Sequence, residues 1–562
     1  MPGFFAKEAI YAPPGFNRWR VPPASIAIHL CIGSVYAWSS FNTPLTRALG
    51  VVTPAADDWS LSSVLAVFTI AIVCLGLSAA LAGSWLEKVG PRTVGLVAAA
   101  CWGGGFLIGG VGILTHQLWL LYLGYGVIGG CGLGLGYVSP VSTLIRWFPD
   151  RRGLATGMAI MGFGGGAIIG APLKEAFVKR YYQPPQYVGM TSEVALTTAD
   201  GRRFADVSGR KTEVVVVSDK DVGQMIVQGQ PGVYVVGTGS SGVAATFFAL
   251  GGLYFFVMLG AALSYRLPAP GWRPAGWTPP DPQLAARKMV SHSHVELNTA
   301  LRTPQFYLLW IVLCFNVTAG IGVLGVAKTI MTDLFGAALP QLVTSDFAKM
   351  YVVMISVANL LGRFLWASAS DYLGRKPTYA IFLVLGTLLY ASIPFIARQV
   401  SASPSVVWVV VFYAVTMVIF TMYGGGFATI PAYLADLFGT RFVGGIHGRL
   451  LTAWSTAGVL GPMALAALRE RSILQAIQNL ASQADPTAFL QKFGAPLTDL
   501  PQLIQSKTVT ISRLLEVCPP GTVDPSSTLY NTTMFLMAGL LAVAAVANGC
   551  IRPVDTKYVA HD

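Results

Sequence analysis

Two ten-residue stretches, GSWLEKVGPR at 83–92 and ASASDYLGRK at 367–376, share one pattern at corresponding places in the chain. Each stretch follows a long apolar run, and each contains an acid, a glycine and a basic residue in the same order. The alignment runs at an offset of 284 residues and pairs Glu87 with Asp371, Gly90 with Gly374 and Arg92 with Lys376. Because this offset is close to half of the 562-residue chain, the repeat predicts two halves built on one plan.

The composition indicates a membrane protein. Charged residues make up 11% of the chain and hydrophobic residues 54%, whereas a soluble domain carries roughly 25% charged residues. Twelve apolar windows are each long enough to cross the hydrocarbon core as an α-helix, and their continuous apolar character does not fit a β-barrel. The windows are 24–43, 62–84, 94–113, 118–140, 154–173, 243–264, 306–327, 350–370, 378–397, 406–428, 448–467 and 530–551.

The repeat and the windows together predict an all-α membrane protein with two six-helix bundles, 1–264 and 306–562, joined by a polar, proline-rich linker at 265–305. A parallel repeat of six spans is expected of a two-bundle transporter. Two insertions, 174–242 and 468–529, interrupt this plan between the fifth and sixth windows of each half. The first contains strand-like pieces and the second short amphipathic helices. Both fit an external cap or partner site, and both equally fit tolerated loop insertions.

Outside the two insertions, the two tails and the joins that follow the even-numbered windows hold 18 Lys and Arg, whereas the four short loops on the other side (44–61, 114–117, 328–349 and 398–405) hold 4. The positive-inside bias therefore predicts that both termini and the linker are cytoplasmic and that both insertions are external. We expect a multi-pass plasma-membrane protein in contact with membrane lipid, such as a protein of a bacterial inner membrane, with no cleaved signal peptide. The net charge of +12 follows from this topology. It does not indicate nucleic-acid binding, because no basic stripe is interleaved with aromatic residues.

Arg363 lies in NLLGRFLWASASDYLGRK (359–376) and is the only formal charge between Lys349 and Asp371. At about 1.5 Å of helix rise per residue, it lies about 12 Å inside the membrane from Asp371. A charge at that depth is costly unless it faces a cavity or a partner, which favours a functional site. A guanidinium can hold a carboxylate through two parallel hydrogen bonds and stays charged at any working pH. The alternative is a structural arginine bonded to helix carbonyls or to an acid.

The motifs and their order resemble a known family. The acid, glycine and basic residues that follow the second and eighth windows are typical of the major facilitator superfamily, which the chain resembles over nearly its whole length. More narrowly, the chain resembles the oxalate/formate antiporter family, which is related to the monocarboxylate transporters. The insertions are not covered by this resemblance. The motifs that carry it are GSVYAWSSFNTPL (33–45), RWFPDRRGLATGMAIMGFGGGA (146–167), the 359–376 stretch, YGGGFATIPAYLADLFG (423–439) and IHGRLLTAWSTAGVLGP (446–462).

The resemblance implies roles for particular residues. In that family the arginine of the eighth span binds the substrate carboxylate, which here is Arg363. Dicarboxylate transporters of the family add a lysine in the eleventh span, where this sequence has Trp454. A dianion would then meet one charge instead of two, so a monocarboxylate fits better. Aromatic residues that match or neighbour the family's site positions are Tyr36, Tyr137, Tyr423, Phe427 and Trp454.

The simplest proton-coupling scheme of the related monocarboxylate transporters is not the one expected here. Those proteins place an aspartate one turn before the arginine, where this sequence has Asn359, which does not titrate. His29 in the first window is the nearest titratable candidate inside a span. A lone histidine on a helix is also a common hydrogen-bonded packing residue, and this alternative stays open.

The sequence therefore predicts a secondary active transporter of a small organic anion, most simply a monocarboxylate such as formate or lactate, moved by exchange or by ion-coupled symport. The alternatives are an oxalate or dicarboxylate exchanger and, in another class, a transporter-like sensor that uses the insertions. We expect no enzyme activity, cofactor, metal site or ATP dependence, because no matching motif is present. The two latches predicted to govern the conformational change comprise Gly83, Glu87, Gly90, Arg92, Asp371, Gly374, Arg375 and Lys376.

Overall fold

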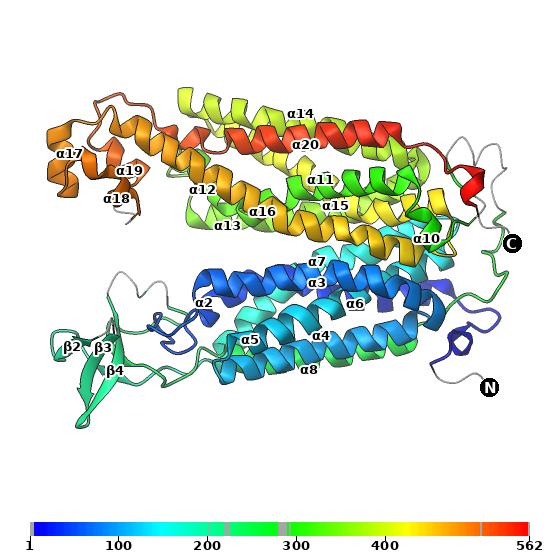
Figure 1. Cartoon of the computed structure of the whole chain (residues 1–562), viewed down its shortest axis with the longest axis horizontal. Helices are drawn as coiled ribbons and strands as arrows, with labels where there is room; N and C mark the ends of the chain where they lie inside the picture. Colours follow the sequence, from blue (N-terminus) through cyan, green and yellow to red (C-terminus); the bar gives the residue numbers. More distant parts are fainter. Residues whose placement is uncertain are drawn as a thin grey trace.

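The protein is represented by a computed structural model, which describes residues 5–199, 202–218, 222, 225–278, 289–291, 294–505 and 509–559. Long helices run side by side in two groups, and the chain passes from one group to the other after residue 265 (Figure 1). We call these groups the first half and the second half. Both termini lie at one end of the long axis, the terminal end, and the β-strands lie at the other, the insertion end (Figure 1). Residues 279–288 and 292–293 of the expected linker lie outside the described residues.

Twelve helical stretches of the described chain are long and apolar enough to cross a membrane. They agree with the twelve apolar windows of the sequence, although most are longer than the windows. The stretches are Arg18–Leu45, Leu61–Val89, Pro91–Leu114, Leu118–Trp147, Arg152–Tyr181, Val243–Ser264, Pro304–Gly325, Ser345–Leu373, Arg375–Ala402, Val406–Phe438, Val443–Ala481 and Pro525–Cys550.

The first half contains the helices of the first six spans. Its elements are η1 (Lys7–Ile10), η2 (Arg18–Arg20), α1 (Val21–Gly33), η3 (Ser34–Phe41), α2 (Asn42–Leu45), α3 (Leu61–Val89), α4 (Pro91–Leu114), α5 (Leu118–Leu121), the π-helical η4 (Tyr122–Gly129), α6 (Gly130–Trp147), α7 (Arg152–Tyr181) and α8 (Val243–Ser264).

The second half repeats this plan. Its elements are α10 (Leu297–Ala300), α11 (Pro304–Gly325), α12 (Ala327–Phe335), α13 (Ser345–Leu373), α14 (Arg375–Ala402), α15 (Val406–Phe438), α16 (Val443–Ala481), α17 (Pro486–Phe493), η6 (Leu497–Asp499), α18 (Leu500–Gln505), α19 (Ile511–Leu515), η7 (Pro525–Thr528), α20 (Asn531–Cys550) and η8 (Thr556–Tyr558).

Local chemistry sets the ends of the corresponding helices α3 and α13. Ser60 accepts a hydrogen bond from the Ser63 amide at the start of α3, and Thr344 accepts one from the Phe347 amide at the start of α13. These side chains satisfy amides that the first helical turn leaves without partners. Both helices end at a glycine of positive φ, Gly90 at +82° and Gly374 at +88°. A residue with a Cβ adopts that conformation only with strain, so the two tight reversals depend on glycine.

The first span is a broken helix. The α-helix α1 gives way to the 3₁₀ segment η3, within which Ala37 has non-helical angles of φ −90° and ψ 26°. The break changes the direction of the chain just after Tyr36. It also leaves the carbonyl of Ser34 available, and this oxygen accepts a hydrogen bond from Nζ of Lys174 at 2.6 Å. The buried ammonium of Lys174 also lies 4.7 Å from the ring centroid of Phe41.

The first insertion forms a small antiparallel sheet at the insertion end (Figure 1). The sheet has the order β1-β5-β4-β3-β2 and rests on the loop that joins the first two spans. The Gly237 amide donates to the Leu49 carbonyl at 3.1 Å, and Arg202 pairs with Asp57 at 2.7 Å. The strands are β1 (Tyr187–Gly189), β2 (Leu196–Ala199), β3 (Arg202–Val207), β4 (Arg210–Val217) and β5 (Gly232–Val235).

The second insertion is helical. Helix α16 continues to Ala481, about 14 residues beyond the predicted end of its span, and then packs against α17 and α19. Ile477, Leu480, Phe489 and Leu514 are buried in this small apolar core. The amphipathic pattern of the sequence therefore corresponds to helices, but the first of them is an extension of the span.

The two halves meet mainly along two helix pairs, α3 with α16 and α7 with α13, while α15 also packs against α7 and α16 against α6. Small residues allow the close approach: a side chain at Gly448 would collide with the backbone of Ala79, and one at Gly153 would collide with the carbonyl of Ala367. Ser455 of α16 also donates to the Ile72 carbonyl of α3 at 2.6 Å. We call these two helix pairs the inter-half interface.

Candidate functional site

Arg363 is buried at this interface, with 1% of its surface exposed. Its Nε donates to Oδ1 of Asn359 at 3.2 Å, and its Nη1 donates to the Ile160 carbonyl of α7 at 3.3 Å. Nη2 has no hydrogen-bond partner, and no acid of the described chain forms an ion pair with the guanidinium. Arg363 therefore carries a buried positive charge with one nitrogen available to an anion.

Aromatic rings from both halves enclose the guanidinium. Its central carbon lies 5.2 Å from the ring centroid of Phe427 on α15 and 5.9 Å from that of Phe163 on α7. Trp454 of α16 completes the enclosure, with its centroid 5.2 Å from that of Phe427 and 5.3 Å from that of Phe163. The faces of these rings attract a cation electrostatically. The rings therefore stabilise the charge without occupying its hydrogen-bonding nitrogens.

Several polar atoms around these rings are buried and lack hydrogen-bond partners. They are the hydroxyls of Tyr36, Tyr137 and Tyr423 and the indole nitrogen of Trp454. The hydroxyl of Tyr36 faces Arg363, Tyr423 and Trp454 without a hydrogen bond of standard geometry. Buried polar groups in proteins are nearly always hydrogen-bonded, and each exception requires an explanation. Here the unpartnered groups are mainly donors that can bind the oxygens of a small anion.

The structure thus brings together the substrate-binding residues predicted from the sequence. Tyr36 lies 6.4 Å and Tyr137 5.4 Å from Trp454 between ring centroids, and Tyr423 lies 5.3 Å from Phe427. Asn359 is in place as the hydrogen-bond partner of Arg363. These residues come from η3, α6, α13, α15 and α16, so the site exists only when the two halves are packed together.

His29 adjoins this group on α1 and is fully buried. Its Nδ1 lies 2.6 Å from the Ala159 carbonyl and its Nε2 3.2 Å from the Tyr137 carbonyl. Both contacts are to acceptors, whereas a neutral imidazole carries only one N–H donor. Protonation would supply the second donor, while burial away from water opposes the charge.

Sequence reasoning missed two residues of the site. Phe163 belongs to a glycine-rich stretch, GFGGGAIIG (162–170), in which only the glycines drew attention. His447 precedes Trp454 by seven residues, which places both on one face of α16 two turns apart. Its ring lies 5.8 Å from Tyr137, and both of its buried nitrogens lack hydrogen-bond partners. The seven-residue spacing from Trp454 was the signal that could have identified it.

Asp371, at the end of α13, bonds across the inter-half interface to the first turn of α7. Its two oxygens accept hydrogen bonds from the amides of Gly153 at 2.8 Å and Leu154 at 2.9 Å. Helix α7 has no side-chain cap from its own sequence, so a carboxylate of the second half caps a helix of the first. This contact also places a negative charge at the positive end of the helix dipole.

Charged residues support this cap from both halves. Arg375 pairs with Asp371 at 2.6 Å and with Asp436 at 2.9 Å, and Arg152 pairs with Asp436 at 2.8 Å. All four side chains are largely buried. The network therefore closes the two halves together at the terminal end.

Glu87 occupies the equivalent place in the first half. One of its oxygens pairs with Arg146, and the other faces Gly444 in the first turn of α16. Lys7 donates to the Glu87 carbonyl at 3.2 Å, and burial lowers the pKa of the Lys7 ammonium. In each half, therefore, a carboxylate near the end of a span faces the start of a helix in the opposite half: Glu87 lies near the end of the second span and Asp371 near the end of the eighth.

The basic residues aligned by the repeat bind within their own halves. Arg92 donates to the Tyr265 carbonyl at 3.4 Å, and Lys376 donates to the carbonyls of Gly549 at 2.8 Å and Ile551 at 2.7 Å. Tyr265 and Gly549 are themselves separated by the repeat offset. Arg92 thereby joins the start of the third span to the end of the sixth, and Lys376 joins the start of the ninth span to the end of the twelfth. Gly83 packs on Gly445 at the inter-half interface.

No group of three or more potential metal ligands (His, Cys, Asp or Glu) occurs among the residues described.

Comparisons with known proteins agree with the fold. The family model of the Major Facilitator Superfamily matches residues 25–188. The fucose:proton symporter of E. coli superposes with a TM-score of 0.52 at 9% sequence identity, covering 95% of this chain and 99% of that one.

Two of the relatives that are similar over most of the chain are named for the small carboxylates they carry. The oxalate:formate antiporter of Oxalobacter formigenes is 24% identical over 87% of this chain and 95% of its own length. Apicoplast pyruvate carrier 1 of Toxoplasma gondii is 25% identical over 75% of this chain and 78% of its own.

The twelve membrane spans and these similarities place the chain among multi-pass membrane proteins of the transporter class. The chain is similar to the Major Facilitator Superfamily over residues 25–188 and to the oxalate:formate antiporter over most of its length. The predicted fold class of twelve membrane helices is thereby confirmed, together with a small sheet in the first insertion.

Proposed function

We propose that the protein is a secondary transporter of a small monocarboxylate and that Arg363 binds the carboxylate. The observation that carries this proposal is the buried guanidinium, which forms no ion pair in the described chain and has a free Nη2. Charges buried without a partner are costly. An anionic substrate would supply the missing partner and satisfy the free nitrogen.

Trp454 supports a monoanion over a dianion. The indole gives the site one hydrogen-bond donor and a large apolar surface, but no second positive charge. A second carboxylate in this aromatic enclosure would lose its hydration without a compensating ion pair. Formate, lactate and similar acids present one carboxylate, and the unpartnered tyrosine hydroxyls can bind its oxygens or a neighbouring hydroxyl.

An oxalate exchanger is the second candidate, because a relative similar over most of the chain is named an oxalate:formate antiporter. The aromatic enclosure and Arg363 would serve either substrate. The choice depends on whether the tyrosine and indole donors compensate for a second negative charge. Uptake of oxalate compared with formate separates the two candidates.

We infer that transport alternates between arrangements of the two halves and that the carboxylates of Asp371 and Glu87 hold one of these arrangements. Outside the insertions, the excess of Lys and Arg in the tails and joins at the terminal end supports a cytoplasmic placement of both termini. His29 is the proposed proton-binding residue if transport is coupled to protons, since protonation would give its ring a donor for each of its two carbonyl neighbours.

The test is uptake of labelled formate, lactate and oxalate into proteoliposomes, with and without a pH gradient and with or without preloaded substrate. Arg363→Gln should abolish saturable uptake, because an amide cannot replace the charge. Arg398→Gln, which removes an exposed arginine near the end of α14, is the matched control and should transport normally. Stimulation by a pH gradient indicates symport, and stimulation by preloading indicates exchange. Wild-type rates in Arg363→Gln would refute the carboxylate site.

A further inference from the structure

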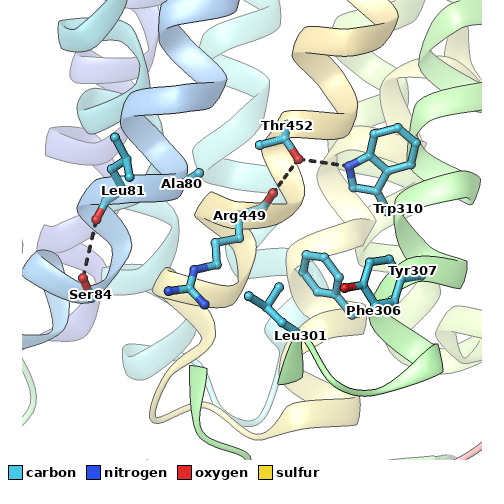
Figure 2. A pocket seen from close by; sticks show the side chains of 9 residues that line it. All are labelled: Ala80, Leu81, Ser84, Leu301, Phe306, Tyr307, Trp310, Arg449 and Thr452. Atoms are coloured by element: carbon cyan, nitrogen blue, oxygen red, sulfur yellow. Dashed lines mark hydrogen bonds between the residues drawn. The ribbon is translucent and has the colours of Figure 1, made fainter. Parts of the chain in front are cut away.

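A groove opens between α3, α11 and α16 (Figure 2). It lies near the terminal end, where α11 and α16 begin, and none of its lining residues belongs to the substrate site. Its volume is about 720 Å³, and residues of both halves line it. Figure 2 shows Arg449 of α16 extending into the groove, with the aromatic side chains of α11 on one side and α3 on the other. The lining residues are Ala80, Leu81, Ser84, Leu301, Phe306, Tyr307, Trp310, Arg449 and Thr452.

The groove faces lipid. Leu81 of α3 is 78% exposed and Tyr307 of α11 is 56% exposed, and both residues belong to membrane spans. An exposed apolar side chain at such a position contacts acyl chains. Tyr307 and Trp310 lie within the first two turns of α11, which begins at the terminal end. Tyrosine and tryptophan at such depths are typical of the boundary between headgroups and hydrocarbon.

Arg449 provides an anion-binding group at this boundary. Its Nη1 donates to the Leu297 carbonyl at 3.4 Å and to Oδ1 of Asn298 at 3.0 Å. It forms no ion pair with any acid of the described chain, and its side chain is only partly buried. The remaining guanidinium nitrogens are therefore available to an anion.

The side chains of Trp310 and Thr452 are already engaged. Trp310 Nε1 donates to Thr452 at 3.0 Å, and Thr452 donates to the Arg449 carbonyl at 2.8 Å. The acids nearest in sequence do not line the groove: Glu87 pairs with Arg146, and Glu296 precedes α10 on the exposed surface. Two exposed basic residues add positive charge nearby. Lys88 lies on α3 after the lining residue Ser84, and Arg302 follows the lining residue Leu301 just before α11.

We propose that this groove binds an anionic glycerophospholipid of the leaflet at the terminal end. The phosphate bonds to the guanidinium of Arg449, whose planar fork matches phosphate oxygens. An acyl chain lies along Leu81, Phe306 and Trp310. Apart from Leu301, which lies between α10 and α11, the lining residues belong to α3 of the first half and to α11 and α16 of the second. A bound lipid therefore contacts both halves in the arrangement described here.

Fluorescence quenching of the full-length protein tests the site. The protein is reconstituted in phosphatidylcholine vesicles that contain increasing fractions of brominated phosphatidylglycerol. The signal of Trp310 is obtained as the difference between the wild type and Trp310→Phe. Arg449→Gln should raise the phosphatidylglycerol fraction at half-maximal quenching about fivefold, the factor expected for one basic residue at an anionic surface. Arg398→Gln removes an exposed arginine at the opposite end of the spans and should leave this fraction unchanged.

A comparison of lipids keeps the test decisive even if Arg449→Gln folds poorly. In the wild type, brominated phosphatidylglycerol should quench Trp310 at a several-fold lower fraction than brominated phosphatidylcholine. Equal quenching by the two lipids would mean ordinary boundary lipid and would overturn the proposal. The same conclusion would follow if a well-folded Arg449→Gln protein kept the wild-type midpoint. Because the readout is lipid binding, it is independent of the transported substrate.

Discussion

Asp371→Asn should release the first turn of α7 from the second half. In the wild type, each carboxylate oxygen accepts one amide hydrogen bond, from Gly153 at 2.8 Å and from Leu154 at 2.9 Å. Asparagine keeps one accepting oxygen and replaces the other with an NH₂ group, which is a donor and faces a donor. A hydrogen bond to a charged group contributes about 1.5–3 kcal/mol, so the capped arrangement should lose about 2 kcal/mol.

This loss predicts a faster amide hydrogen exchange in the first turn of α7. A change of about 2 kcal/mol corresponds to about a 30-fold change in an equilibrium constant. Amide hydrogen exchange of peptides covering 152–158 should therefore accelerate by about that factor, since the two capped amides are themselves the reporters. Mass spectrometry of the protein in detergent micelles or nanodiscs gives the exchange rates.

The matched control, Asp346, lies at the opposite end of α13 from Asp371. Asp346 is 89% exposed and, among the described residues, pairs only with the exposed Lys349, so Asp346→Asn should leave exchange at 152–158 unchanged. If Asp371→Asn also changed these rates by less than twofold, the carboxylate would not be holding the start of α7. The account of the cap across the inter-half interface would then be wrong.

Two further predictions concern the site. Trp454→Lys adds a second positive charge beside Arg363, and the ratio of oxalate to formate uptake in proteoliposomes should rise at least tenfold; an unchanged ratio would contradict the role given to Trp454. Replacement of the two buried histidines should affect the stability of the protein differently. His29→Leu loses contacts with two carbonyls and should lower the free energy of unfolding by about 1–3 kcal/mol, whereas His447→Leu removes two unpartnered nitrogens and should not lower it. Equal losses in chemical denaturation would argue against this distinction.

Much of the fold could be read from the sequence because lipid imposes a simple requirement. A segment that crosses hydrocarbon must be apolar and must satisfy its own backbone hydrogen bonds. The twelve windows therefore located the spans, although not their ends. The sequence did not reveal that α16 runs on to Ala481, because that extension is stabilised by packing against α17 and α19, outside any span.

The site was predictable in part for a different reason. Arg363 is identifiable from its depth alone, since an isolated charge in an apolar run is costly. Lys174 satisfies the same criterion in part, being fully buried within the fifth span. It was not predicted as a buried charge because it directly follows the predicted end of the fifth window at residue 173. Its hydrogen bond to Ser34 depends on the break in the first span. No local sequence pattern predicted this break.

By itself the sequence determined the number of spans, the repeat and the residue that carries the buried charge, because these depend on hydropathy and on short motifs. Only the tertiary structure decided which groups meet. Phe163, Phe427 and Trp454 come from three helices and enclose one guanidinium, and Asp371 caps a helix more than two hundred residues earlier. Such contacts depend on how each helix is rotated and packed against its neighbours. That arrangement is set by the shapes of many side chains together, so no single stretch of sequence specifies it.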